Sequence, residues 1–264
     1  MPDTVVVVGA GLTGLACAAS LPGRIRPVVV DRIPVPGGVH GWDTDETRSA
    51  EAAARSRGAI LHLGETATRW DGEELLVMGQ DGVRRIPARA LVVAAGSRPL
   101  GRAELGLAGP RPAGILAATV ACHLSETGLL AGRRPAVVGG GDWAARAVAE
   151  LLHAGAEHIQ VVTPDGVLRR FPESPALTVR TATPVAVEGG PRVSALRLQG
   201  GERVECDALV LAHGLVPLRN VDGAVWEGAR TVYAQPADDP ATVSAARQAG
   251  AAAAAEVEQM LDAA

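Results

Sequence analysis

Four consecutive valines, at positions 5–8, begin the pattern of apolar positions along the chain. An unbroken β-branched run of this kind is typical of a strand that is buried on both faces of a parallel sheet. The small apolar residues from Leu12 to Leu21 predict a helix, which Pro22 and Gly23 end. A further apolar run at 27–30 predicts the next strand. The order strand, turn, helix, strand favours an α/β fold.

The same pattern returns later in the chain. Residues 136–138 predict a short strand, residues 142–153 a helix that Asp142 caps, and residues 158–163 the next strand. Two further segments also match each other, LVVAAGSRP at 91–99 and LVLAHGLVP at 209–217. An internal duplication explains both pairs. We therefore expect two nested Rossmann-like dinucleotide-binding domains, formed by residues 1–108 with 215–264 and by residues 109–214.

Each half also contains a stretch of alternating apolar and polar residues with turn signals. In the first half the turns fall at Asp71-Gly72 and Asp81-Gly82, and in the second half at Gly189-Gly190 and Gly200-Gly201. Such alternation predicts a small antiparallel meander in each domain. The Ala-rich segment near the end, residues 249–261, predicts a helix.

The first glycine-rich turn follows a predicted strand and begins a predicted helix. In its G-x-G-x-x-G spacing Gly9 permits the tight turn, Gly11 lets a diphosphate approach the backbone, and Gly14 lets the helix pack on the strand. Asp31 follows about twenty residues later, where a carboxylate accepts hydrogen bonds from ribose hydroxyls. Its charge disfavours a 2′-phosphate, so the sequence predicts a dinucleotide with a free adenosine ribose at this turn.

The second turn is less complete. Gly139 and Gly141 take the first two glycine roles and Ala144 the third, and Asp165 is a candidate for the ribose carboxylate. Arg169 and Arg170 offer the alternative of a 2′-phosphate, so NADH and NADPH both stay open. Two prolines at 172 and 175 exclude the helix that a full unit places there. Whether this second, reduced domain binds a nucleotide at all stays open for that reason.

Composition removes several function classes. The net charge is −4 with a pI near 5.9, and the 25 basic residues are scattered, so we expect neither a nucleic acid nor a membrane as partner. All 25 are Arg, which excludes a Schiff-base lysine and the Lys-containing phosphate loop. Without a signal peptide or a membrane span in the sequence, we expect a cytoplasmic protein. Cys17, Cys122 and Cys206 are far apart and are expected to be buried, without metal or disulfide chemistry.

With these two turns and closing strands, nearly the whole chain resembles the pyridine nucleotide-disulfide oxidoreductases, flavoproteins with two dinucleotide-binding domains. The resemblance implies FAD at the first turn and NAD(P)H at the second. The residues that it assigns to the adenosine diphosphate part of FAD are Gly9, Gly11, Gly14 and Asp31 with the neighbouring Arg32. It places Gly37 and Gly38 in a loop beside the cofactor, Gly96 at the exit from the first domain, and Gly139, Gly141 and Ala144 against the nicotinamide nucleotide.

Within that family, GILAATVACHLSETGLLAGRRPAVVGGGDWA and CDALVLAHGLVP resemble the α subunits of heteromeric amine dehydrogenases of the opine oxidase and hydrogen cyanide synthase type. These subunits also lack the redox cysteine pair. The resemblance implies an FAD-dependent oxidoreductase whose flavin accepts a hydride from a small-molecule donor, with a second flavoprotein subunit as partner. The alternatives are a stand-alone NAD(P)H-dependent flavin reductase and a non-catalytic subunit that binds adenine nucleotide.

One departure from the family concerns the closing step. Gln235 and Pro236 stand where the family has Gly-Asp beside the flavin, and Asp238 or Asp239 can replace that acid or cap the following helix. FAD and a bare adenine nucleotide therefore both stay open at the first turn.

Several rings outside the turns carry competing interpretations. His40 and Trp42 either shape access to the flavin or lie in an exposed loop, and the second interpretation is favoured. His213 is expected to be a hydrogen-bonded structural residue, and Trp70 and Trp226 are expected to pack. No side chain identifies itself as a catalytic base.

Overall fold

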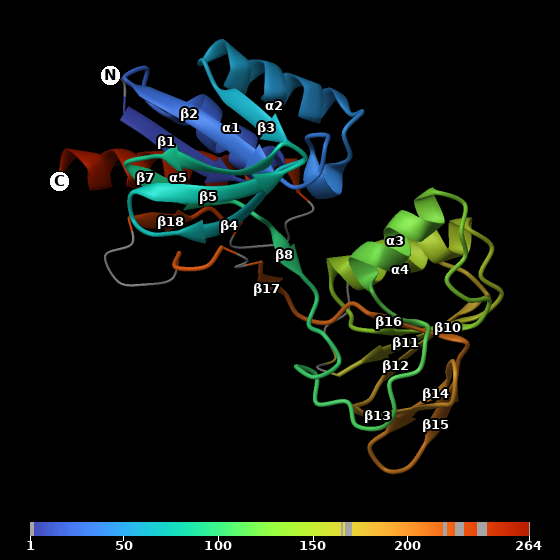
Figure 1. Ribbon diagram of the computed structural model, residues 1–264. Helices are drawn as coiled ribbons and strands as arrows, with labels where there is room; N and C mark the ends of the chain where they lie inside the picture. Colours follow the sequence, from blue (N-terminus) through green and yellow to red (C-terminus); the bar gives the residue numbers. More distant parts are fainter. Residues whose placement is uncertain are drawn as a thin grey trace. The chain divides into compact units, whose positions relative to one another are not determined.

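The computed structural model describes residues 3–164, 166, 171–218, 221–224, 230–236 and 242–263 (Figure 1). The chain divides into two compact units. Unit 1 comprises Met1–Ser97 and Pro217–Ala264, and unit 2 comprises Arg98–Val216. Among the described residues, no helix combines the length and the apolar character that crossing a membrane requires.

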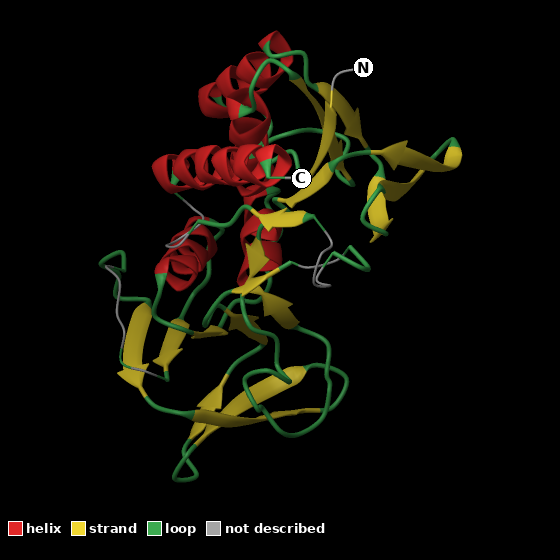
Figure 2. Cartoon of the chain, turned by 90° about the vertical axis from the view of Figure 1, so that its left-hand side faces the viewer, coloured by secondary structure: helices red, strands yellow, loops and turns green. Residues whose placement is uncertain are grey.

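Unit 1 is built on a parallel sheet with the strand order β18-β7-β1-β2-β3. Its valine-rich central strands are buried on both faces, as the apolar runs predict. One face carries the helices and the other carries the antiparallel meander (Figure 2). The strands of the sheet are β1 (Asp3–Val8), β2 (Ile25–Asp31), β3 (Ile60–Leu63), β7 (Ala90–Val93) and β18 (Thr231–Tyr233). The meander consists of β4 (Thr66–Trp70), β5 (Glu74–Gly79) and β6 (Gly82–Pro87). The helices are α1 (Leu12–Ser20), α2 (Asp45–Ser56) and α5 (Val243–Asp262), with the short 3-10 helix η1 (Gly38–His40).

Unit 2 repeats this plan with the sheet order β12-β11-β10-β16-β9, again parallel. Its helices pack on one face of the sheet and its meander on the other. The strands of the sheet are β9 (Ile115–Ala117), β10 (Pro135–Val138), β11 (Ile159–Thr163), β12 (Leu177–Thr181) and β16 (Ala208–Leu211). The meander consists of β13 (Pro184–Gly189), β14 (Val193–Leu198) and β15 (Arg203–Glu205). The helices are α3 (Ala118–Glu126) and α4 (Asp142–His153).

The sheet registers relate the two units position by position. Val8 pairs with Val30 in unit 1, and Val138 pairs with Val162 in unit 2, so β1 corresponds to β10 and β2 to β11. The strand–helix pair β18 and α5 corresponds to β9 and α3, which occupy the same sheet position but come first in unit 2. The predicted α/β fold with parallel dinucleotide-type sheets is confirmed.

Two local predictions differ from the structure. The predicted domain boundary near residue 108 lies too late, because Leu107 is buried in the core of unit 2 and the Ala108 N–H donates to Val185 O at 2.9 Å. The division falls instead between Ser97 and Arg98, within the short strand β8 (Ser97–Arg98), which pairs with β17 (Val216–Pro217). The N-cap of α4 is Gly141, so Asp142 lies in the first turn of the helix and does not form its cap.

Candidate functional site

The first glycine turn connects β1 to α1 at the carboxyl end of the unit 1 sheet. Gly9 has a φ of +114°, and a Cβ at this position would lie 2.2 Å from Ala94 O, so only glycine fits. A Cβ on Gly14 would lie 1.9 Å from Gly9 O, which shows how closely α1 approaches the turn. The Gly9 N–H donates to Val30 O at 2.8 Å and ties the turn to β2. Both glycines are therefore required by packing.

Gly11 is different, because the structure does not require glycine there. Its φ of −71° suits any residue, and a Cβ would meet no atom within 4 Å. Gly11 is also the N-cap of α1 and has no side chain to cap the helix. The open space lies at a helix N-terminus, where unpaired N–H groups and the helix dipole favour an anion. This is the geometry that a dinucleotide diphosphate needs.

Asp31 is held at the end of β2 beside that turn. Its Oδ2 accepts from the Ala10 N–H at 2.6 Å, and its Oδ1 accepts from the Ile33 N–H at 2.8 Å. Each carboxylate oxygen keeps a second acceptor position after these bonds. The next residue, Arg32, is exposed. Asp31 is thus oriented by the backbone of the glycine turn itself, with capacity left to accept from ribose hydroxyls.

The loop that begins at Gly37 and Gly38 packs directly against the turn. The Gly37 N–H donates to Ala10 O at 2.8 Å, and Gly11 and Gly37 form an isolated parallel bridge. Both loop glycines have a positive φ, and a Cβ on Gly37 would lie 2.1 Å from Gly41 O. The structure therefore brings Gly9, Gly11, Gly14, Asp31, Gly37 and Gly38 together at one edge of the sheet.

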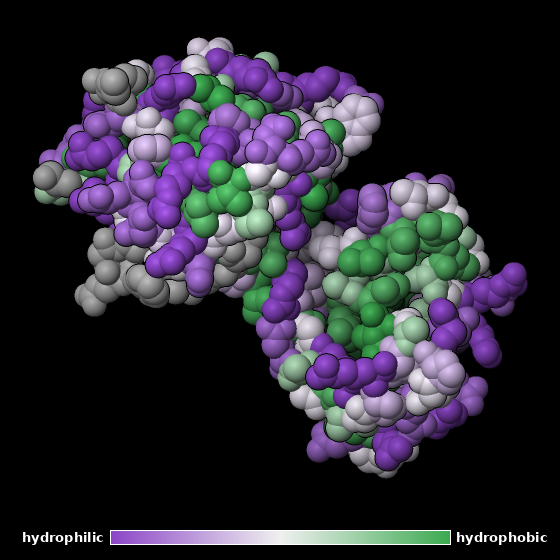
Figure 3. Space-filling model, viewed as in Figure 1, coloured by the Kyte–Doolittle hydropathy of each residue, from purple (hydrophilic) through white to green (hydrophobic). Residues whose placement is uncertain are grey.

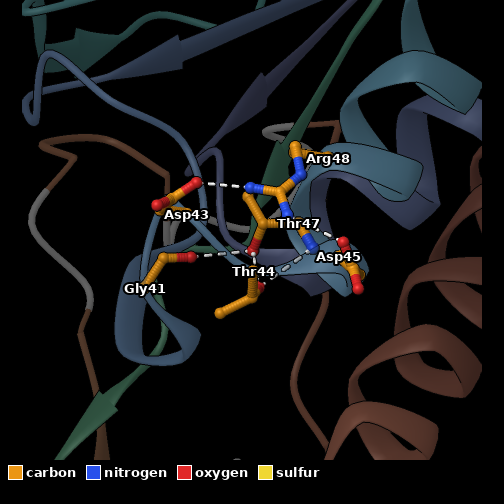
Figure 4. Close-up of polar contacts among 6 residues, drawn as sticks. All are labelled: Gly41, Asp43, Thr44, Asp45, Thr47 and Arg48. Atoms are coloured by element: carbon orange, nitrogen blue, oxygen red, sulfur yellow. Dashed lines mark hydrogen bonds and ion pairs between the residues drawn. The ribbon is translucent and has the colours of Figure 1, made fainter.

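A threonine pair fixes the far end of this loop, and the sequence interpretation missed it (Figure 4). The fully buried Thr47 donates from Oγ1 to Gly41 O at 2.8 Å, and its N–H donates to Thr44 Oγ1 at 3.2 Å. Arg48 pairs with Asp45 at 2.7 Å and also with Asp43. The signal for this arrangement is the N-cap pattern D-T-D-E-T at 43–47.

Two loop rings lie close to this pair. Trp42 is 60% exposed, which favours the exposed-loop interpretation of that ring. His40 is half-buried and its Nε2 is buried, so this interpretation does not extend to the imidazole of His40. Trp70, in contrast, is buried in the core beneath the unit 1 meander, as predicted. Trp226 lies outside the described residues.

The closing strands meet the site at Gly96. Its carbonyl accepts from the Leu218 N–H at 2.9 Å and from Gln235 Nε2 at 3.2 Å. A neutral carboxamide therefore bonds to the backbone where the family places an acid. The candidate replacements Asp238 and Asp239 lie outside the described residues. The carbonyl of His213 accepts from the Leu100 N–H at 3.0 Å.

A second missed residue, Gly250, sets the position of α5. A Cβ there would lie 2.3 Å from Thr13 O, so α5 crosses α1 with its backbone nearly in contact. This crossing places α5, which follows β18, against the helix of the first turn, α1. Gly250 stands within an Ala-rich run, where nothing in the sequence pattern distinguishes a close approach from a helix-weakening glycine.

The second turn reproduces the backbone of the first. Gly139 has a φ of +132°, its N–H donates to Val162 O at 2.9 Å, and a Cβ would lie 2.6 Å from Ala212 O. Gly141 caps α4, and a Cβ there would meet no atom within 4 Å. Ala144 is fully buried against α3 and the sheet. The second turn therefore offers the same open approach for a diphosphate.

The ribose-binding position of the second turn is different. By sheet register Thr163, at the end of β11, corresponds to Asp31. Thr163 is fully buried, so its hydroxyl does not present an exposed acceptor as the Asp31 carboxylate does. The predicted candidates Asp165, Arg169 and Arg170 lie outside the described residues. Among the described residues between β11 and β12 no helix occurs, as Pro172 and Pro175 predict.

The three cysteines are free and buried, as predicted. Burial raises the pKa of Cys17 to about 12 and the pKa values of Cys122 and Cys206 to about 11. The thiols are therefore protonated at neutral pH, and a protonated thiol is a poor nucleophile.

Comparison with known proteins agrees with this geometry. Residues 1–116 match the family described as "Pyridine nucleotide-disulphide oxidoreductase". The fold of the whole chain is similar to a pyridine nucleotide-disulfide family oxidoreductase from Enterococcus faecalis V583, with a TM-score of 0.71 and 15% identity over 97% of this chain and 69% of that one. It is similar to thioredoxin reductase from Lactococcus lactis, with a TM-score of 0.71 and 15% identity over 100% of both chains.

A third similar structure is L-proline dehydrogenase from P. horikoshii, with a TM-score of 0.66 and 17% identity over 98% of this chain. This chain spans only 56% of that protein. No curated protein gave a significant match. The matched family depends on FAD and NAD(P)H, the cofactors that the resemblance implies. The first 116 residues thus carry the sequence pattern of the pyridine nucleotide-disulphide oxidoreductases, on a fold that the whole chain shares with a solved member of that family.

Proposed function

We propose that the chain is an FAD-dependent oxidoreductase that holds the dinucleotide at the first glycine turn. The observation that carries the proposal is the pairing of an open Gly11 with a backbone-anchored Asp31. Close backbone contacts explain why positions 9 and 14 hold glycine. No described protein atom fills the space beside Gly11, and the described hydrogen bonds of Asp31 leave acceptor positions on its carboxylate. A nucleotide diphosphate and its ribose fill both needs at once.

The residues of the chain bind and orient this group. The N-terminus of α1 stabilises the diphosphate charge, and the Asp31 carboxylate accepts from ribose hydroxyls and disfavours a 2′-phosphate. The Gly37–Gly38 loop, fixed by Ala10 on one side and by Thr47 on the other, supplies a rigid wall without side-chain carbons at the glycines. When bound, the flavin supplies the capacity to accept a hydride.

The second turn retains only part of what a nicotinamide nucleotide needs. Gly141 and the N-terminus of α4 suit a diphosphate, but the position that matches Asp31 holds the buried Thr163. We propose that this turn binds NAD(P)H more weakly than the first turn binds FAD. The matched position itself carries no carboxylate, so the side chain of Thr163 does not repel a 2′-phosphate by charge.

We further propose that the chain acts as a subunit of a heteromeric amine or amino-acid dehydrogenase, with a second flavoprotein as partner. The α-subunit resemblance of residues 114–144 and 206–217 supports this, and so does the likeness to L-proline dehydrogenase. Apolar side chains gather over α3 and α4 on the face shown in Figure 3. Val120 of α3 is 46% exposed, and Leu129, which follows α3, is 59% exposed. Co-purification of a tagged chain with a co-expressed flavoprotein from the same gene cluster supports the subunit role, and purification of the chain alone contradicts it.

One observation favours a second candidate, a subunit that holds adenine nucleotide without redox chemistry. Gln235 replaces the acid that the family places beside the flavin, and its amide bonds to Gly96 O. In this alternative the first turn holds an adenosine diphosphate group and nothing beyond it. Extraction of the bound nucleotide by heat or acid distinguishes the two candidates, because only FAD gives a yellow, fluorescent extract.

The visible absorption spectrum of the purified chain tests the main proposal. We expect a flavin spectrum for the native chain and its loss in Gly11→Ala, because the new Cβ occupies the diphosphate space without a steric clash inside the protein. Gly23→Ala is the matched control, since Gly23 is equally open but lies in the turn before β2. A colourless native chain overturns the flavin assignment. Equal flavin content in Gly11→Ala overturns the assigned site.

A further inference from the structure

Strand β12 forms one edge of the unit 2 sheet and pairs with β11 alone among the described strands. Edge strands expose backbone donors and acceptors, and proteins usually protect them with charge, proline or a covering element. In β12 the side chain of Val179 is 38% exposed at the middle of the strand. Among the described strands, none other than β11 occupies this edge.

Comparison with unit 1 explains why Val179 is exposed. By register Val179 corresponds to Leu61 of β3, the edge strand of the unit 1 sheet. Leu61 packs into a core that includes Ala50 and Ala54 of α2. The described residues between β11 and β12 form no helix, so none of them supplies the cover that α2 gives Leu61.

The hydrogen-bond register shows which backbone groups point outward. The Ile159 N–H donates to Ala176 O at 2.7 Å, and the Ala182 N–H donates to Thr163 O at 3.2 Å. In a parallel ladder alternate residues bond to the same neighbour, so Thr178 and Arg180 bond to β11. Val179 and Thr181 direct their N–H and C=O groups away from β11, and neither N–H has a partner in the described turns and loops.

We propose that β12 of one chain pairs antiparallel with β12 of a second copy, about a two-fold axis at Val179. Because Val179 presents both its N–H and its C=O outward, the two copies of this residue satisfy each other as a hydrogen-bonded pair. The same register lets the Thr181 N–H of each copy donate to Leu177 O of the other. In an isologous interface both copies contribute the same surface, so that surface must be complementary to itself. The outward donors and acceptors of β12 meet this requirement.

The side chains of LTVRT are self-complementary in this register. On one face the two exposed Val179 side chains become cross-strand neighbours, flanked by Leu177 against Thr181. On the other face Arg180 lies opposite Thr178 and not opposite its own copy. Arg180 already pairs with Glu202 and donates to Gln160 Oε1 at 3.1 Å. Pairing of two copies thus covers the exposed valine and opposes no like charges.

A five-residue strand pair buries less surface than a permanent dimer requires, so the dimer is expected to be weak and concentration-dependent. Sedimentation velocity of the full chain over a wide concentration range tests it. We expect the native chain to shift from monomer to dimer as concentration rises, and Val179→Lys to weaken the association at least tenfold. The substitution places two like charges opposite each other at the two-fold axis.

Two further variants make the test specific. Val83→Lys is the matched control, because Val83 is also an exposed strand valine but lies on β6 of unit 1, and we expect it to associate like the native chain. Val179→Pro removes the outward N–H while leaving the bonds to β11, so it is expected to weaken association as well. A native chain that stays monomeric throughout overturns the proposal. Equal weakening by Val83→Lys and Val179→Lys also overturns it, since net charge then accounts for both.

Discussion

The two glycine turns share a backbone but differ in what surrounds it. In both, the first glycine has a positive φ, donates to the second strand and fits against the closing strand, and the second glycine is open. Asp31 stands at the end of β2, whereas the buried Thr163 stands at the matched position of β11. The turn is thus kept by the packing of strand and helix, and ligand-binding groups can be lost without disturbing it.

The third position shows that packing differs as well. A Cβ at Gly14 would lie 1.9 Å from Gly9 O, yet unit 2 accommodates the Cβ of Ala144 at the equivalent place. Helix α4 must therefore begin farther from its turn than α1 does. The closer approach in unit 1 accompanies the tight crossing of α1 by α5 at Gly250.

The largest expected effect comes from exchanging these third residues. Gly14→Ala forces a methyl group against backbone and is expected to lower the free energy of unfolding by about 3 kcal/mol. The reverse change, Ala144→Gly, removes one methyl group from a helix and is expected to cost about 1 kcal/mol. Urea unfolding followed by circular dichroism measures both. Equal losses would show that the two helices approach their turns alike.

A smaller effect is expected from the ribose position. Asp31→Asn replaces the charged acceptor and is expected to weaken FAD binding ten- to a hundredfold, about 1.5–3 kcal/mol for a bond to a charged group. Thr163→Val, at the matched position of unit 2, is expected to leave FAD affinity unchanged. Fluorescence titration of the flavin-free protein gives both constants. If Thr163→Val weakens FAD binding as much as Asp31→Asn, the assignment of FAD to the first turn is wrong.

The smallest expected effect is the pH dependence of stability that the buried thiols cause. Burial raises their folded pKa values above 9.0, so folding binds their protons and the resulting stability is complete below about pH 9. Stability then falls as the pH rises through 9 toward the folded values, by about 1 kcal/mol per thiol at pH 10.

The thiols are unequally divided, which makes this effect a probe of each unit. Cys17 belongs to unit 1, whereas Cys122 and Cys206 belong to unit 2. Urea unfolding at pH 8 and pH 10 should therefore show the larger loss in the transition of unit 2, and Cys206→Ala should reduce that loss. A pH dependence that Cys206→Ala leaves unchanged contradicts the assignment to the thiol.

Much of this organisation could be predicted from the sequence because it depends on local signals. Valine runs, glycine spacing and Asp-Gly or Gly-Gly turns gave the parallel strands, both turns and both meanders. The correspondence between Asp31 of unit 1 and Thr163 of unit 2 could not be predicted from the spacing of residues in the sequence, because it depends on the register between neighbouring strands. Thr47 and Gly250 were also missed, since a hydroxyl that anchors a loop and a glycine that admits a neighbouring helix act through contacts distant in sequence.

The nucleotide content of two equivalent variants, Gly11→Ala and Gly141→Ala, tests directly whether FAD is held at the first glycine turn and not at the second. Chromatography of the nucleotides that denaturation releases measures this content. Each substitution places one methyl group in the open space of one turn and clashes with nothing else. We expect Gly11→Ala to release little FAD and Gly141→Ala to release as much as the native chain. Loss of FAD from Gly141→Ala with retention in Gly11→Ala would contradict it.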